Sequence, residues 1–175
     1  MKYCVECLQP DTRPNTKFTN KICPVCNYKK TLPKVNWEER FDILKRIIKP
    51  YKNKKPYNCI IGVSGGKDST RQALWVRDKL GLNPLLVCLA YPPEQVTEIG
   101  ANNISNLINL GFDVEIVSIS PQFWQKLLRI GFLEHCNWAK FTEQAIISSV
   151  PRAAIRHKIN LIFWGENPAE SVGDL

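Results

Sequence analysis

The chain has 175 residues, 44% of them hydrophobic, and a formal net charge of +8, which suits one soluble globular domain with a small appendage. No stretch approaches the roughly 18 apolar residues of a membrane-spanning helix, and the first residues lack the apolar core of a signal peptide. We therefore expect a cytoplasmic protein without a membrane partner. The charge is uneven: residues 1–56 hold 14 Lys/Arg and 5 Asp/Glu, whereas the remainder is close to neutral.

Residues 1–34 contain two C-x2-C pairs, "CVEC" and "CPVC", separated by fifteen residues. Each pair can present two thiolates to one tetrahedral ion, so this spacing predicts a zinc-ribbon-like segment. We expect the zinc to be structural, because four thiolates leave no open coordination position. The expected ligands are Cys4, Cys7, Cys23 and Cys26. The alternative is a redox pair or four unrelated thiols.

Residues 35–57 are expected to form a helix followed by a basic, proline-containing linker. A helix is predicted over residues 36–49, with Asn36 as its N-cap and Glu39 three residues later. Apolar residues recur on one face at helical spacing: Trp37, Phe41, Leu44 and Ile48.

From residue 58 onwards, short apolar runs alternate with longer amphipathic stretches. Strands are predicted at 59–63, 84–90, 113–119 and 160–164. Helices are predicted at 68–81 and 97–111, and across 121–158 with breaks near Gly131 and Pro151. This alternation predicts an α/β domain over 58–175, with a parallel sheet whose ligands bind at the carboxyl ends of the strands.

The stretch Ser64–Ser69, "SGGKDS", lies between the first predicted strand and the following helix. It is not a Walker A loop, because Asp68 follows the lysine where that motif has Ser or Thr. Gly65 and Gly66 allow the backbone to approach an anion closely, and the start of the next helix favours negative charge. Lys67 adds a positive charge, and Asp68 suggests a bridging Mg²⁺. The sequence therefore predicts a phosphate-binding loop.

This loop resembles that of the PP-loop ATP pyrophosphatase superfamily, which has a Rossmann-like adenine nucleotide alpha hydrolase fold. The resemblance implies that ATP is cleaved between its α- and β-phosphates after a substrate oxygen attacks the α-phosphorus. It also implies that adenine lies along the ends of the first two strands, near Gly62 and Ala90. The implied nucleotide-binding residues in the loop are Ser64, Gly65, Gly66, Lys67, Asp68 and Ser69.

The segment "WGENPAESVG", together with the N-terminal cysteine pairs, resembles the N-acetyl sugar amidotransferase family of bacterial surface-polysaccharide and flagellin-glycan biosynthesis, including lipopolysaccharide. This resemblance implies conversion of an acetamido group into an acetamidino group, with ammonia from a partner glutaminase. Glu166, Asn167 and Glu170 would line the site, and the implied catalytic residues are Lys67, Asp68 and Glu166. The alternative role of the two glutamates is helix capping.

Other interpretations remain open at this point. The main alternative is ATP-dependent tRNA 2-thiolation, and a further one is a non-catalytic nucleotide- or RNA-binding zinc module. The expected partners are a sugar substrate and a glutaminase and not nucleic acid. The basic N-terminal part leaves a nucleic-acid partner as an alternative. Arg152 and Arg156 would meet phosphates or be solvated helix residues. Because PP-loop sheets have at least five strands, we expect the domain to be incomplete after the fourth.

Overall fold

The computed structural model describes residues 1–12, 16–53 and 56–166. The described chain divides into two compact units, one of residues 1–44 together with Glu166, the other of residues 45–165. Within the described ranges, no helix is both long enough and apolar enough to cross a membrane.

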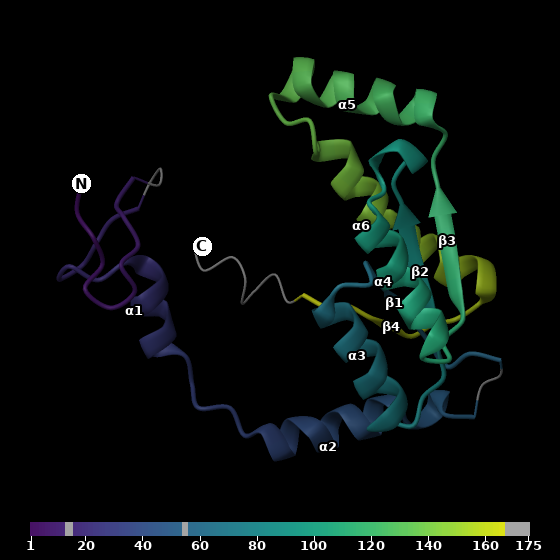
Figure 1. The fold of residues 1–175 in the computed structure, drawn as a ribbon. Helices are drawn as coiled ribbons and strands as arrows, with labels where there is room; N and C mark the ends of the chain where they lie inside the picture. The colour runs from purple at the N-terminus through teal and green to yellow at the C-terminus, as the bar shows by residue number, and fades with distance from the viewer. Residues whose placement is uncertain (13–15, 54–55, 167–175) are drawn as a thin grey trace. The chain divides into compact units, whose positions relative to one another are not determined.

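The larger unit contains a four-stranded sheet in the order β3-β2-β1-β4 (Figure 1). The strands are β1 (Cys59–Gly62), β2 (Pro84–Ala90), β3 (Val114–Ser118) and β4 (Ile162–Phe163). All neighbouring strands are parallel, with register pairs such as Ile60 with Leu85 and Ile61 with Phe163. The predicted α/β fold with a parallel sheet is confirmed, and the first strand lies between the second and the fourth.

The helices that connect these strands begin and end at recognisable signals. They are α3 (Lys67–Asp78), α4 (Glu98–Asn109), α5 (Pro121–His135) and α6 (Lys140–His157), with short 3-10 turns η1 (Lys49–Tyr51) and η2 (Pro93–Gln95). The Thr97 hydroxyl accepts the amide of Gly100 at 3.1 Å and caps α4, and Ser120 caps α5 in the same way. Gly111, with φ +87°, turns the chain out of α4 towards β3.

The predicted helix breaks near Gly131 and Pro151 are wrong, because both residues lie inside helices. The interruption falls at residues 136–139, where Cys136 ends α5 in the left-handed conformation with φ 48°. A Cβ at Gly131 would lie 2.7 Å from the carbonyl oxygen of Asn137, so this glycine allows the loop to fold back on the helix. The missing amide of Pro151 is tolerated in a helix whose neighbouring residues are buried against the sheet.

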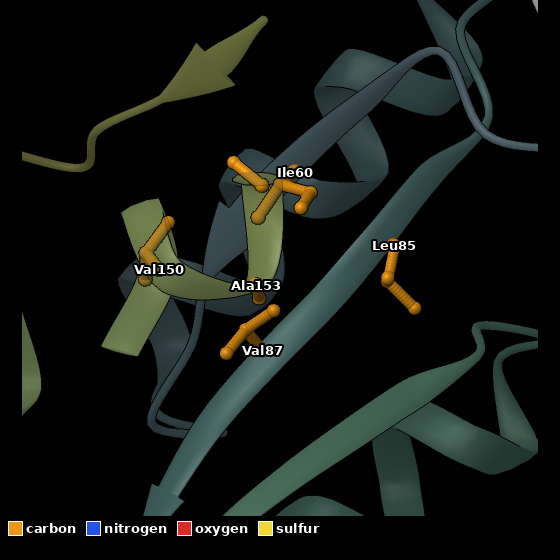
Figure 2. Packing of buried hydrophobic residues seen from close by; sticks show 6 residues of the cluster. Ile60, Leu85, Val87, Val150 and Ala153 are labelled. Carbon is orange, nitrogen blue, oxygen red and sulfur yellow. The ribbon is translucent and has the colours of Figure 1, made fainter. Parts of the chain in front are cut away.

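One face of the sheet packs against α6 (Figure 2). Its core combines strand residues with small and branched residues of the helix: Ile60, Leu85, Val87, Val150, Ala153 and Ala154. A Cβ at Gly62 would lie 2.8 Å from Cγ2 of Val150, so the glycine at the end of β1 lets α6 approach. On the other face, Ile61 and Leu86 are fully buried, as are Ala73 and Val76 of α3.

The smaller unit contains α1 (Pro24–Thr31), which the sequence did not predict, and most of α2 (Trp37–Ile48), which it did. Asn36 caps α2 as expected, because its Oδ1 accepts the amide of Glu39 at 3.3 Å. The predicted apolar face is buried only at its end: Ile48 is inaccessible, whereas Trp37 is 72% exposed.

Candidate functional site

The predicted phosphate loop leaves the sheet directly after β1. The amide of Val63 donates to the carbonyl of Val87 at 2.9 Å, so strand pairing extends to the residue that precedes the loop. Gly65 then takes a left-handed conformation with φ +75°, and Gly66 precedes the first residue of α3 in an extended conformation. The sequence therefore folds locally into strand, two-glycine turn and helix, as the motif requires.

Gly65 is required by its surroundings as well as by its backbone conformation. A Cβ at this position would lie 2.9 Å from Cβ and 3.0 Å from the carbonyl carbon of Asn103 in α4. Because part of the obstacle is backbone, it cannot move aside as a flexible side chain would. The loop thus has its shape fixed by a helix that is remote in sequence.

The loop hydroxyls bond to the loop itself. Ser69 Oγ donates to the carbonyl of Gly66 at 3.2 Å and accepts the amide of Ser64 at 3.4 Å, and Ser64 Oγ accepts the amide of Gly66 at 3.4 Å. The amides of Lys67, Asp68 and Ser69 have no acceptor among the residues the structure describes. These three donors at a helix N-terminus favour an anion.

Lys67 and Asp68 pair with each other at the mouth of the loop. Nζ lies 2.9 Å and 3.0 Å from the two carboxylate oxygens, and the side chains are 89% and 87% exposed. An ion pair in such contact with water contributes little to stability. Either group can therefore turn towards a ligand at little cost, the lysine towards phosphate and the carboxylate towards a divalent cation.

The structure places some of the other predicted site residues near the loop and others away from it. Gly62 and Ala90 lie at the carboxyl ends of the adjacent strands β1 and β2, at the edge that carries the loop. Glu166 is exposed and falls outside the compact unit that contains the loop. Asn167 and Glu170 lie outside the described residues.

A glutamine that the sequence analysis did not single out joins the end of β4 to the loop helix. Gln72 of α3 donates from Nε2 to the carbonyl of Trp164 at 2.8 Å. Its Oε1 is buried and has no partner within the described ranges. This contact fixes the position from which the chain leaves the sheet towards Glu166.

A cavity of about 510 Å³ lies between α5 and α6, at the carboxyl ends of β2 and β3. The strands contribute Leu89, Val117 and Ser118, and Ile119 follows β3. The helices contribute Phe123, Leu127, Phe141, Gln144, Ala145, Ser148, Ser149, Arg152 and Arg156. The sequence analysis missed this cavity. The available signal was a run of polar residues at helical spacing, Gln144, Ser148 and Arg152, on a helix that also carries the core.

A second, open groove of about 610 Å³ runs from the loop between α3 and α4. Its α3 side carries Lys67, Arg71 and Trp75, spaced four residues apart on one face of the helix, and Lys79, which caps the end of α3. Asn103 and Asn106 of α4 lie opposite.

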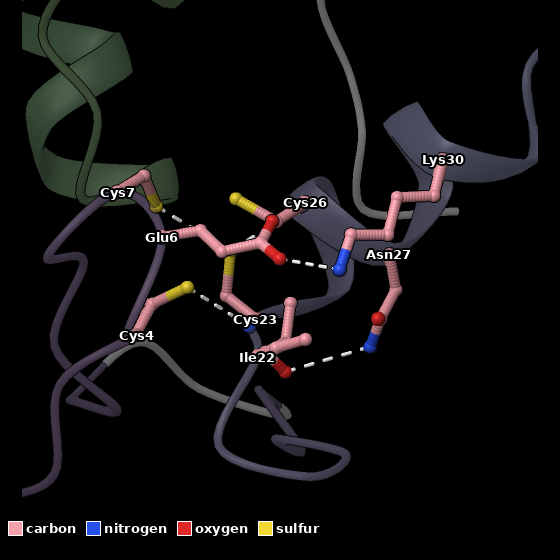
Figure 3. A network of polar contacts seen from close by, with 8 residues as sticks. All are labelled: Cys4, Glu6, Cys7, Ile22, Cys23, Cys26, Asn27 and Lys30. Carbon is pink, nitrogen blue, oxygen red and sulfur yellow. Dashed lines mark hydrogen bonds and ion pairs between the residues drawn. The ribbon is translucent and has the colours of Figure 1, made fainter.

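The four predicted metal ligands come together in the smaller unit (Figure 3). Their sulfur atoms all lie within 4.8 Å of one another, and Cys7 and Cys23 are 3.6 Å apart. Zinc–sulfur bonds of about 2.3 Å give sulfur–sulfur distances of about 3.8 Å, so the cluster needs only a slight contraction to hold the ion. Glu6 and Lys30 form an ion pair beside it.

Hydrogen bonds prepare one of these sulfurs for metal binding. Burial raises the pKa of Cys4, but hydrogen bonds from backbone amides, that of Cys23 foremost, outweigh it and hold the pKa at about 6. The contact with Cys7, and then burial, raise the pKa of Cys26. The cluster thus combines one readily ionised thiol with one that a cation must deprotonate.

The remaining cysteines differ in exposure. Cys59 and Cys88 are buried in strands, and burial raises the pKa of both, to about 12 for Cys59. Cys136 is exposed.

No family model matches this sequence, and no curated protein matches it. NH3-dependent NAD synthetase from Campylobacter jejuni has a similar structure, with a TM-score of 0.52 and 19% identity over 79% of this chain and 60% of that chain. NMN synthetase from Francisella tularensis gives a TM-score of 0.45 at 20% identity over 78% of this chain and 57% of that chain. The U34-tRNA thiolase NcsA from Methanococcus maripaludis gives a TM-score of 0.38 at 16% identity over 97% of this chain and 56% of that chain.

This chain thus spans less than two thirds of the length of each of these structures. The likeness to the NAD synthetase confirms the expected PP-loop fold with its parallel sheet. The resemblance to the N-acetyl sugar amidotransferase family has no counterpart among these three structures.

Proposed function

We propose that this chain is a PP-loop enzyme that cleaves ATP to AMP and pyrophosphate to activate an amide oxygen. The observation that carries the proposal is the loop Ser64–Ser69, at the carboxyl edge of the sheet, where three amides at the start of α3 have no acceptor among the described residues. A pyrophosphate group fits these donors and the charge of Lys67. Asp68 would hold Mg²⁺, which when bound neutralises phosphate charge.

The proposed acceptor is the acetamido group of a bacterial glycan sugar. Its oxygen attacks the α-phosphorus and expels pyrophosphate; ammonia then attacks the activated carbon, and AMP leaves with that oxygen, giving an acetamidino group. Amide oxygen is a poor leaving group until it is adenylated. This reaction therefore needs the cleavage of ATP to AMP and pyrophosphate that is proposed for the loop. The resemblance of "GENPAE" and of the cysteine pairs supports this acceptor, and an NH3-dependent synthetase has the same fold.

A separate glutaminase is proposed as the source of ammonia. A glutaminase thiol needs a histidine partner. Here the ring nitrogen of His157 lies 2.6 Å from the Glu115 carboxylate, and His135 packs edge-on against Phe141. Neither histidine makes a hydrogen bond with a thiol in the part of the chain that the structure describes.

Product analysis tests the proposed function. The chain is incubated with ATP, Mg²⁺, ammonium and an acetamido sugar such as N-acetylglucosamine 1-phosphate, together with the glutaminase where one copurifies. AMP and pyrophosphate are expected in equal amounts, with an amidine product one mass unit lighter than the acetamido sugar. ADP and inorganic phosphate as primary products would contradict the loop assignment.

The groove on α3 favours a second candidate, ATP-dependent thiolation of RNA. Lys67, Arg71 and Lys79 lie on one helix face with Trp75 between them, and residues four apart on a helix are separated by about 6 Å along its axis. Cations at such intervals with an aromatic ring suit the phosphates and a stacked base of a single strand. If this candidate is correct, a labelled single-stranded RNA should bind at low salt, and the double variant Arg71→Gln/Lys79→Gln should bind it much more weakly. No binding by the wild type would remove this candidate.

A further inference from the structure

We infer that the cavity between α5 and α6 binds the acceptor molecule, and that Arg152 makes it selective for an acceptor carrying a carboxylate or phosphate. The inference rests on the proposed function, because it names the class of substrate that the same site would take. It also assigns the specificity to a part of the chain that is distant in sequence from the phosphate loop.

The position of the cavity fits an acceptor. It lies at the carboxyl ends of β2 and β3, on the face of the sheet covered by α6. Val150 contacts the end of β1 at Gly62, and Ser149 and Arg152, which line the cavity, are its near neighbours on α6. The cavity therefore begins within about one helical turn of the strand that leads into the phosphate loop.

The lining suits a polyhydroxylated ring. Phe123, which is 52% exposed, and Phe141 offer aromatic surface. The hydroxyls of Ser148 and Ser149 donate to carbonyls of their own helix, at 3.3 Å and 2.8 Å. Their oxygen atoms thus remain available as acceptors, and sugar hydroxyls are donors. The volume of about 510 Å³ is typical of small-molecule pockets.

The charge of the lining residues determines whether the cavity prefers an anionic or a neutral ligand. Two arginines line it, but Arg156 lies 2.8 Å from Oε1 of Glu115, whose other oxygen contacts His157. Arg152 is exposed and has no carboxylate partner among the described residues, and no acidic residue lines the cavity. One uncompensated guanidinium in an acid-free pocket selects a carboxylate or phosphate, which it can bind with two parallel hydrogen bonds.

Two probes that share one ring test this inference. Binding of N-acetylglucosamine 1-phosphate and of neutral N-acetylglucosamine to the whole chain is measured by titration with NMR detection. The wild type should bind the phosphorylated sugar at least about tenfold more tightly. Arg152→Gln should abolish this preference, whereas Arg129→Gln, an exposed arginine of α5 outside the cavity, should preserve it. Phe123→Ala should weaken both probes.

Two outcomes would overturn the inference. One is an unchanged preference in Arg152→Gln. The other is a loss of ATP affinity in Arg152→Gln as large as the loss of sugar phosphate affinity, which would make the cavity part of the nucleotide site. Failure of the proposed function is recognised separately: ADP as the product, with the Arg152-dependent preference intact, would refute the AMP-forming reaction and leave the anion-selective cavity standing.

Discussion

Replacing Lys67 with alanine is expected to lower the rate of AMP and pyrophosphate formation by about 100-fold or more. The leaving pyrophosphate gains negative charge in the transition state, and removing one preorganised charged donor at such a position costs about that much. Lys67 is positioned for this role at the first residue of α3, where the amides of Lys67, Asp68 and Ser69 have no acceptor within the described ranges. Its only ion-pair partner among the described residues is the exposed Asp68.

The experiment compares steady-state rates and ATP affinity in matched variants. Lys126→Ala, at an exposed residue of α5 that lines neither the cavity nor the groove, is the control and should retain nearly full activity. The melting temperature of Lys67→Ala should match that of the wild type, because the side chain is 89% exposed. A Lys67→Ala enzyme that turns over like the wild type would show that the loop does not hold the reacting phosphates.

Replacing Cys23 with serine is expected to remove the bound metal and to unfold the N-terminal segment. Cys23 is fully buried, and its sulfur accepts the amide of Cys26 and contacts the sulfur of Cys7. Among the described residues of 1–34, only Cys4 and Cys23 are buried, so folding of this segment depends on the ion. Structural zinc sites contribute about 10–16 kcal/mol in small domains.

Metal analysis and amide NMR measure this outcome. The wild type should carry one zinc ion per chain, and Cys136→Ser, at an exposed thiol, should keep it. In Cys23→Ser the amide signals of residues 1–34 should collapse, whereas those of residues 45–165, a separate compact unit, should persist. Well-folded wild-type protein without any bound metal would refute the assignment.

Acid should release the same ion from the wild type. Hydrogen bonds lower the pKa of Cys4 from the usual thiol value to about 6. At a pH above the usual thiol pKa, the Cys4 thiolate therefore stabilises the folded cluster in full. This stabilisation is lost as the pH falls through about 6. Protons also compete with the metal for the other three sulfurs, so a falling pH weakens metal binding there as well.

Local patterns in the sequence were sufficient to predict the strands, the glycine turn after the first strand and the clustering of the four cysteines. The run "CIIGV" is apolar on both faces and β-branched, so it forms a buried central strand wherever the fold places it. The two glycines of "SGGKDS" are needed for a turn that only glycine adopts easily, and the cysteine spacing is itself the geometry of the site. In each case the signal and its structural consequence lie within a few residues.

Contacts between segments that are distant in sequence decided the rest. Gly131 and Pro151 carry local signals for a break, yet both stay helical because α6 is buried against the sheet and Gly131 makes room for the carbonyl of Asn137. Arg152 and Arg156 are equivalent as sequence, four residues apart on one helix. Only the tertiary structure places Glu115 of β3 against Arg156 and leaves Arg152 in the cavity without an acidic partner among the described residues, since the pairing depends on which strand lies beside the helix.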